Sequence, residues 1–196
     1  MKTNTSLNIR KMTYLALFTA LVFLLQYISL FMRGPMFSLT FVLVPIVIAV
    51  ALCGFSAGPW LGFVFGIAVL ATGDANAFLA INPIGTVITV LLKGALAGCA
   101  AAFVYKLFEN GKKTQRYIGV TLAAITAPIV NTGVFFLGCL VFFMDFVNSL
   151  TPSGSSAIST IIGTLIGFNF VIELAVNLVL VPVIFRIIEI GKAKFK

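Results

Sequence analysis

The chain has 196 residues, of which 61% are hydrophobic and only 9% are charged. Soluble globular domains are roughly 45–50% apolar and about 25% charged, so this composition excludes an ordinary soluble domain and indicates a membrane protein. The net charge of +8 does not indicate nucleic-acid binding, because the polar stretches are short tails and loops rather than a basic face.

The distribution of apolar residues predicts an all-α membrane protein with one domain, residues 1–196, embedded in the lipid bilayer. A helix needs about 20 apolar residues to cross the ~30 Å hydrocarbon layer. Turn-forming and charged residues separate the apolar runs from one another. The predicted transmembrane spans are roughly residues 12–31, 37–53, 57–72, 84–105, 117–144 and 158–188, which gives a bundle of six transmembrane helices.

The basic residues predict that both termini are cytoplasmic. Positively charged loops are retained in the cytoplasm, and eleven of the thirteen Lys and Arg residues lie at the two ends or between the fourth and fifth spans. These are Lys2, Arg10, Lys11, Lys106, Lys112, Lys113, Arg116, Arg186, Lys192, Lys194 and Lys196. On the opposite side the only basic residue in a loop is Arg33, so most of the positive charge is a topology signal.

Small residues repeat every four positions in four of the predicted spans. The repeats are Ala16 and Ala20; Gly58, Gly62 and Gly66; Gly94 and Gly98; and Gly163 and Gly167. Helices with such faces can approach one another closely, so we expect the glycine faces to pack against other helices. For the two alanines the pattern alone favours the same kind of packing contact within the chain.

Residues 73–83 form the longest outer segment that mixes small, polar and apolar residues. Such a segment can fold over a cavity as a lid or can be a simple connector, and the sequence leaves both interpretations open. As a lid it would bring Asn76, Phe78 and Asn82 against a ligand. Arg33, in the first outer loop, is a second candidate at the rim.

Two charged residues, Lys93 and Glu173, lie well inside predicted spans. An ionisable group at membrane depth is costly and is usually turned toward a partner or a polar cavity. The two could form a structural ion pair with each other, Lys93 could reach to the interface, or both could bind a ligand. Lys93 is flanked by small residues, so we expect it to face protein rather than lipid.

Polar residues deep in the fifth and sixth spans extend this pattern. Asn131 and Thr132 supply hydrogen-bonding groups where lipid supplies none. Asn169, Glu173 and Asn177 are spaced i, i+4 and i+8, which places them along one helical stripe. This stripe should face protein, either as contacts between helices or as one wall of a ligand site.

The candidate residues do not fit an enzyme. The chain has no His, and its three Cys residues lie singly in apolar runs, so the sequence predicts no metal site, cofactor or disulfide framework. No nucleophile with an adjacent base and no phosphate-binding loop is present, so we expect no ATP hydrolysis by this chain. A small-molecule-binding membrane subunit, a structural membrane subunit and a small secondary transporter remain.

Several motifs in order along the chain resemble the substrate-binding S component of energy-coupling factor (ECF) vitamin transporters. They are Ala16-x-x-x-Ala20, Leu39-Thr40-Phe41-x-x-x-Pro45, Gly58-Pro59-x-x-Gly62-x-x-x-Gly66 and Asn131-Thr132. The length and the predicted spans agree with this resemblance, which covers nearly the whole chain.

The resemblance implies a vitamin-binding subunit in the plasma membrane of a prokaryote. Such a subunit holds its vitamin near the outer face under the first and third outer loops, and works with a transmembrane T component and two ABC ATPases. It then topples in the membrane so that the site opens to the cytoplasm. By this resemblance Ala16 and Ala20 contact the T component, residues 73–83 are the lid, and ATP belongs to the partners.

The choice of vitamin rests on Lys93 and on the resemblance to the pantothenate branch. A buried Lys favours an anionic substrate, and pantothenate has one carboxylate, an amide and two hydroxyls that Asn131 and Asn76 could bind. Riboflavin is the alternative, because the twenty Phe residues could form aromatic walls. Folate and a pyridoxine or thiamine precursor stay open.

Overall fold

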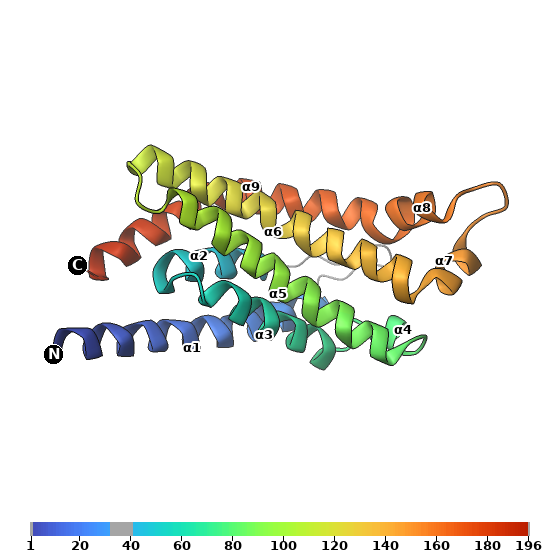
Figure 1. Ribbon diagram of the computed structural model, residues 1–196, viewed down its shortest axis with the longest axis horizontal. Coiled ribbons are helices and arrows are strands. Elements are labelled where there is room, and N and C mark those ends of the chain that lie inside the picture. The colour runs from blue at the N-terminus through green and yellow to red at the C-terminus, as the bar shows by residue number, and fades with distance from the viewer. Residues whose placement is uncertain (1, 32–40, 196) are drawn as a thin grey trace.

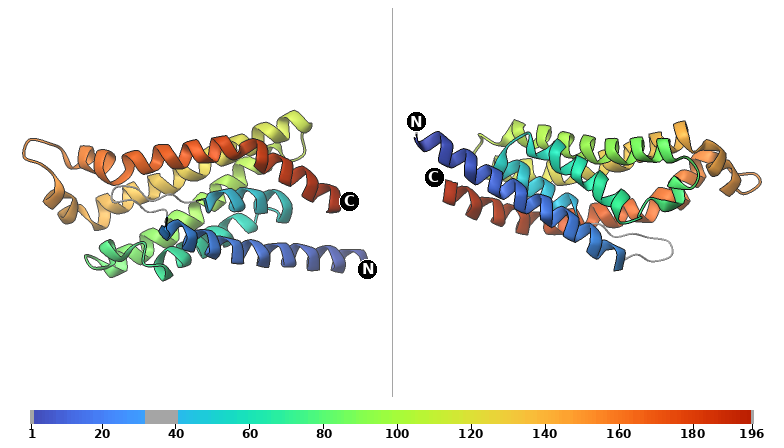
Figure 2. Two further views of the ribbon diagram at one scale, coloured as in Figure 1. Left: turned by 180° about the vertical axis from the view of Figure 1, so that it is seen from behind. Right: turned by 90° about the horizontal axis from the view of Figure 1, so that it is seen from below.

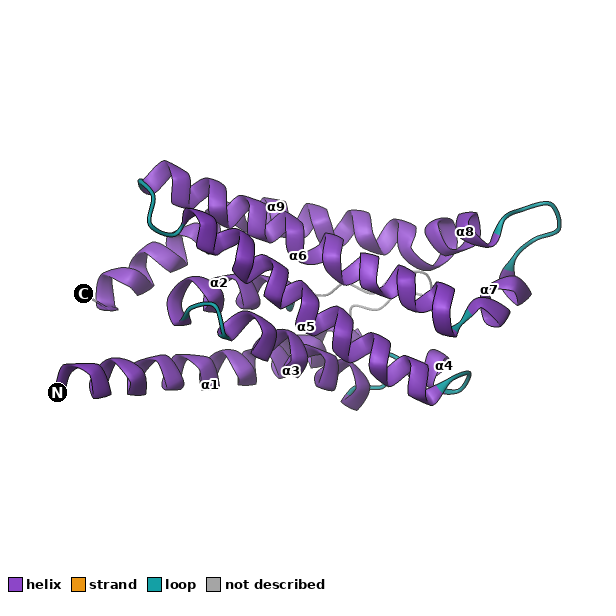
Figure 3. Cartoon of the chain, in the orientation of Figure 1, coloured by secondary structure: helices purple, strands orange, loops and turns teal. Residues whose placement is uncertain are grey.

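The computed structural model describes residues 2–31 and 41–195, with side chains from residue 9 to residue 193 outside the gap. The described part is all helical, without a strand (Figure 3). Its elements are α1 (Lys2–Phe31), α2 (Leu43–Cys53), α3 (Ala57–Ala71), α4 (Asn76–Leu79), α5 (Pro83–Phe108), α6 (Lys113–Phe142), α7 (Met144–Leu150), α8 (Ala157–Thr160), the π-helical η1 (Ile161–Ile166) and α9 (Gly167–Phe195). The predicted helical class is therefore confirmed.

The long helices run side by side along the longest axis of the molecule (Figure 1). Both chain ends and the α5–α6 turn lie at one end of the bundle, which we call the terminal end, and α4 and α7 lie at the other. The two views in Figure 2 agree with this arrangement. The termini thus share one side, as the basic residues predict.

Contacts between polar side chains hold the terminal end together. Arg116 at the start of α6 forms a 3.1 Å ion pair with Glu189 of α9. Lys192 of α9 donates a 2.9 Å hydrogen bond to the hydroxyl of Tyr105 in α5. The basic residues predicted to lie on one side are therefore brought to the same end by helices far apart in sequence.

Four helical stretches are long and apolar enough to cross a membrane, which is fewer than the six spans predicted. They are Ile9–Phe31, Pro83–Phe108, Lys113–Phe142 and Ala157–Ala193. The other two predicted spans contain α2, with 11 residues, and α3, with 15 residues. At 1.5 Å per residue these helices are roughly 16 and 22 Å long, short of the ~30 Å hydrocarbon layer. Residues 37–40 of the second predicted span lie outside the described residues.

The short helix α2 is at the centre of the hydrophobic core. Every residue from Pro45 to Leu52 is buried, and the cluster around α2 includes side chains from α3, α5, α6 and α9. By contrast, α1 is the least buried of the four long helices. The apolar sequence of α2 therefore reflects packing against protein on all sides, whereas that of α1 provides a surface for lipid or for another protein.

The glycine repeats of α3 and α5 face each other. A Cβ added at Gly58 would overlap the backbone at Gly98, and a Cβ added at Gly62 would overlap the backbone at Gly94. The predicted close packing of these two faces is confirmed. The third repeat is not seen to pack in this way, because among the described residues a Cβ added at Gly163 would meet no atom within 4 Å and one added at Gly167 would meet only the preceding turn.

Candidate functional site

A cavity of about 200 Å³ lies between α3, α4, α5, α6, η1 and α9, and its lining residues include Phe78 of α4. Its wall combines aromatic and aliphatic side chains with a small set of polar ones, which is typical of sites for small molecules. The lining residues are Phe65, Val69, Asp74, Ala75, Phe78, Thr86, Thr89, Val90, Lys93, Asn131, Thr132, Phe135, Phe143, Leu165, Ile166, Asn169, Phe170 and Glu173. The cavity is the candidate ligand site of the chain.

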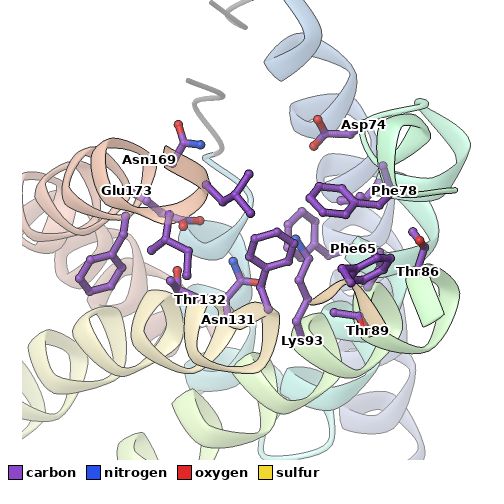
Figure 4. Close-up of a pocket in the computed structure, with 18 residues that line it drawn as sticks. Phe65, Asp74, Phe78, Thr86, Thr89, Lys93, Asn131, Thr132, Asn169 and Glu173 are labelled. Carbon is purple, nitrogen blue, oxygen red and sulfur yellow. The ribbon is translucent and has the colours of Figure 1, made fainter. Parts of the chain in front are cut away.

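Most of the residues predicted from the sequence meet in this cavity. Figure 4 shows Glu173, Asn169, Asn131 and Thr132 on one side, while Phe65, Phe78, Thr86 and Thr89 lie on the other. Lys93 extends from α5 between these two groups. Residues that are far apart in the sequence, from Phe65 in α3 to Glu173 in α9, are therefore brought to one small volume.

Lys93 is surrounded mainly by aromatic rings. Its ammonium nitrogen lies 5.5 Å from the centroid of the Phe135 ring and 6.0 Å from that of Phe65. Contacts of this kind stabilise a cation only modestly, by roughly 0.5–2 kcal/mol. Among the described residues Lys93 forms no direct ion pair with Glu173, although the two charges act on each other electrostatically. Instead of forming a mutual ion pair, Lys93 and Glu173 both line the same cavity.

Glu173 and Asn131 are buried polar side chains with unsatisfied oxygen atoms. Each is 7% exposed, and Glu173 Oε1 and Asn131 Oδ1 have no hydrogen-bond partner in the described part of the chain. The Asn131 side chain also interacts with the Glu173 carboxylate. A buried polar atom without a partner costs about 1–3 kcal/mol, so this arrangement favours a ligand that supplies the missing hydrogen bonds.

The polar stripe of α9 divides into two parts. Asn169 and Glu173 line the cavity, whereas Asn177 does not. Asn177 is fully buried and donates a 2.8 Å hydrogen bond to the backbone oxygen of Glu173. The sequence left open whether this stripe joins helices or forms a ligand wall, and in the structure its first two residues belong to the wall.

The segment predicted as a lid or connector contains the short helix α4. Its Phe78 makes edge-to-face ring contacts with Phe143, Phe135 and Phe146, at centroid distances of 5.0, 5.4 and 5.9 Å. Since Phe78 lines the cavity, α4 covers part of it through this aromatic cluster. The geometry is that of a cover over the cavity rather than of an extended connector.

Two asparagines of the same segment are not among the cavity-lining residues. Asn76 is exposed, and its side-chain amide lies next to Gly73. Asn82 caps α5 by accepting a 2.9 Å hydrogen bond from the backbone N–H of Gly85, and it donates a 3.4 Å bond to the Phe142 carbonyl. Arg33, the other predicted rim residue, lies outside the described residues.

Sequence reasoning missed the polar face that α5 presents beside Lys93. Thr86, Thr89 and Lys93 are spaced i, i+3 and i+7, which puts them on one face of the helix, and all three line the cavity. The Thr89 hydroxyl has no hydrogen-bond partner in the described chain, while that of Thr86 donates to the Asn82 carbonyl. The i, i+3, i+7 spacing could have indicated this polar face, but threonine is common in membrane helices and does not by itself indicate a binding site.

Asp74 is a further cavity residue that the sequence did not single out as a ligand contact. It follows α3, and one of its carboxylate oxygens accepts a 3.2 Å hydrogen bond from Nε2 of Gln26 in α1. Gln26 is itself buried. A polar connection therefore runs from α1 to the cavity wall.

Ala16 and Ala20 lie on the exposed side of α1. Their exposure in the described part of the chain does not support the internal-contact interpretation. Between them, Thr19 accepts a 3.2 Å hydrogen bond from the indole N–H of Trp60 in α3. The small-residue face of α1 is therefore available to another molecule.

Comparison with known proteins gives one match. A protein-family model described as "ECF transporter, substrate-specific component" matches residues 10–185. No curated protein and no solved structure matches the chain significantly. The matched range includes every described residue that lines the cavity.

Proposed function

Because the chain belongs to the family of substrate-specific components of ECF transporters, we propose that it captures a water-soluble vitamin, with pantothenate as its substrate. Proteins of this family are membrane subunits that bind a small molecule. The observation that carries the proposal is the cavity in which Lys93 has aromatic neighbours but no direct ion-pair partner among the described residues. A ligand carboxylate would supply the counter-charge through a charge-assisted hydrogen bond.

The size of the cavity supports pantothenate over riboflavin. At about 200 Å³ it is below the roughly 300–1,000 Å³ usual for drug-sized ligands, which favours a small, flexible molecule over a fused three-ring system. The hydroxyl and amide groups of pantothenate would bond Asn131, Asn169 and Glu173 across the cavity from Lys93. The phenylalanines would then pack against its methyl groups.

The proposed orientation places the cavity near the outer face of a prokaryotic plasma membrane. The terminal end carries the basic residues and would be cytoplasmic, so the opposite end with α4 and the cavity would face outward. Residues 73–83, with α4, would open to admit the vitamin and close over it. The buried α2 and the short α3 would stay within the bundle during this movement.

The proposed partners are a transmembrane T component and two ABC ATPases, which supply the ATP hydrolysis. Substrate-specific components of ECF transporters associate with such partners. The exposed Ala16 and Ala20 would let a partner helix approach α1 closely. Replacing both by Leu should abolish co-purification with the partner proteins while leaving vitamin affinity unchanged. Loss of vitamin binding as well would mean that the two alanines support the fold.

Calorimetric titration of the purified chain in detergent tests the proposed function. The panel is pantothenate, riboflavin, folate, biotin, thiamine and pyridoxine. Pantothenate should bind with a stoichiometry of one, and the other vitamins should bind weakly or not at all. Absence of binding across the whole panel would contradict a vitamin-binding role.

A further inference from the structure

We infer that the cavity recognises a ligand with one anionic group at one end and hydrogen-bond donors at the other, and that Glu173 excludes ligands with a second anion. The inference rests on the proposed function, because it takes the cavity as the vitamin site. It goes further by assigning opposite chemistry to the two sides of the cavity. Lys93 by itself would explain the binding of an anion but not the exclusion of ligands that carry two anions.

The first side of the cavity is an anion-binding side on α5. Lys93 and Thr89 are four residues apart, so their side chains share one face of the helix. Thr89 is 3% exposed, and its hydroxyl has no partner among the described residues. An ammonium and a hydroxyl can together donate hydrogen bonds to both oxygens of one carboxylate. A Cβ added at Gly138 would overlap the Thr89 side chain, so α6 lies close to Thr89 on this side of the cavity.

The second side accepts hydrogen bonds and lies on α6 and α9. An ionised Glu carboxylate has only acceptor atoms, and the unsatisfied atom of Asn131 is its acceptor oxygen. Both side chains are more than nine-tenths buried and line the cavity. A hydroxyl, an amide N–H or an ammonium group would satisfy these oxygens, whereas a carboxylate or phosphate would not.

The separation of the charges makes the cavity selective. Lys93 and Glu173 form no direct ion pair in the described chain, so a ligand placed between them can contact both. The described lining residues include one cation, Lys93, and two acidic residues, Glu173 and Asp74. After the first anion of a ligand pairs with Lys93, a second anion would lie near Glu173, where the described lining residues supply no further cation. Such a desolvated like-charge contact is strongly unfavourable and acts against the wrong ligand.

The inference divides the vitamins by charge. Pantothenate and biotin each have one carboxylate at one end and hydroxyl or N–H donors at the other, so both fit the two sides. Riboflavin has no carboxylate, thiamine is a cation, and folate has two carboxylates. These three should bind at least about 30-fold more weakly than the best monocarboxylate, the ratio that corresponds to the lower end of measured losses at buried charge pairs.

Three ligands that differ at one end only provide the direct test. They are pantothenate, pantothenol, in which an alcohol replaces the carboxylate, and 4′-phosphopantothenate, in which a phosphate replaces the terminal hydroxyl. For the unmodified chain we expect both analogues to bind at least about 30-fold more weakly than pantothenate. Equal affinity for the phosphorylated ligand would overturn the inference, because Glu173 would then not exclude a second anion.

The variant Glu173→Gln assigns the selectivity to one residue. Gln keeps the size of the side chain and removes its charge, so the penalty for 4′-phosphopantothenate should shrink about tenfold while the penalty for pantothenol stays. Glu109→Gln, the same change at the terminal end, should leave both ratios as they are. An unchanged phosphate penalty in Glu173→Gln would overturn the assignment. If Glu173→Gln does not fold, the three ligands on the unmodified chain decide.

The outcomes separate this inference from the proposed function. If the unmodified chain binds riboflavin, thiamine or folate best, vitamin binding stands and the inference fails. If it binds biotin best, the inference stands, and biotin against its neutral alcohol replaces the pantothenate pair. If no vitamin binds, the proposed function fails.

Discussion

Helix α5 has two faces that the chain uses in opposite ways. On one face Gly94 and Gly98 meet the glycines of α3 so closely that an added Cβ would overlap backbone atoms. On the other face Thr89 and Lys93 border a cavity and lack hydrogen-bond or ion-pair partners in the described chain. The first face stabilises the fold by close packing, whereas the second leaves polar groups unpaired at the cavity that is proposed to hold the ligand.

This contrast explains how a helix in an apolar environment can hold a buried cation. Close backbone packing gives α3 and α5 dispersion contacts that lipid cannot replace, and it fixes the direction in which Lys93 points. The favourable packing energy of the bundle can then offset the unfavourable free energy of burying Lys93 and Glu173 without a direct ion pair. Close packing and the proposed ligand site therefore lie on different faces of one helix, so substitutions can change each face separately.

The largest expected effect comes from breaking the packed face. In Gly62→Leu the new side chain would collide with the backbone of Gly94, which cannot move aside without separating α3 from α5. We expect a loss of stability of about 3 kcal/mol or more, measured by thermal unfolding in detergent. Gly163→Ala is a control at a glycine whose added Cβ would meet no described atom within 4 Å, so the unfolding temperature should stay the same or rise slightly. A folded, stable Gly62→Leu would contradict the close packing.

The next largest effect comes from the cavity face. Lys93→Met keeps the length of the side chain and removes its charge, so it should weaken an anionic vitamin by roughly 2–5 kcal/mol in a calorimetric titration. Stability without ligand should be equal or higher, because an unpaired cation is lost from an aromatic environment. A variant that loses stability and keeps its affinity would show that Lys93 is structural.

The smallest effect is expected where α5 begins. Asn82 caps this helix through Gly85, so Asn82→Ala should lower stability by about 1 kcal/mol and change vitamin affinity little. Thermal unfolding and titration of the same sample measure the two quantities. If the loss of binding free energy is much larger than the loss of unfolding free energy, then Asn82 contacts the ligand when residues 73–83 close over the cavity, as the sequence predicts.

The sequence was informative where a residue type has few possible roles at its position. Lys93 and Glu173 inside apolar runs predicted a polar site, and the glycines of α3 and α5 predicted a close contact, because neither feature is tolerated against lipid. Asn76 and Asn82 show the limit of this reasoning. Asparagine at a helix start can cap the backbone as well as bind a ligand, and only the structure shows that Asn82 caps α5.

The remaining differences also have physical reasons. Six apolar runs predicted six spans, and four stretches of the described chain are long and apolar enough to confirm that number in part. Hydropathy does not distinguish a helix surrounded by lipid from one surrounded by protein, and the described residues of α2 are packed against protein. The glycine pair of the sixth span has the same spacing as those of α3 and α5, yet it falls at the π-helical η1, where the change in helical pitch removes a continuous face. The aromatic wall around Lys93 comes from α3 and α6, which no local pattern connects.

The central claim is that this ECF substrate-specific component holds an anionic vitamin at Lys93 in the cavity between α5, α6 and α9. The most direct measurement is a calorimetric titration of the purified chain with pantothenate, run in parallel on Lys93→Met. The account predicts saturable binding at a stoichiometry of one to the unmodified chain and a loss of roughly 2–5 kcal/mol in the variant. Equal binding to both proteins would contradict it.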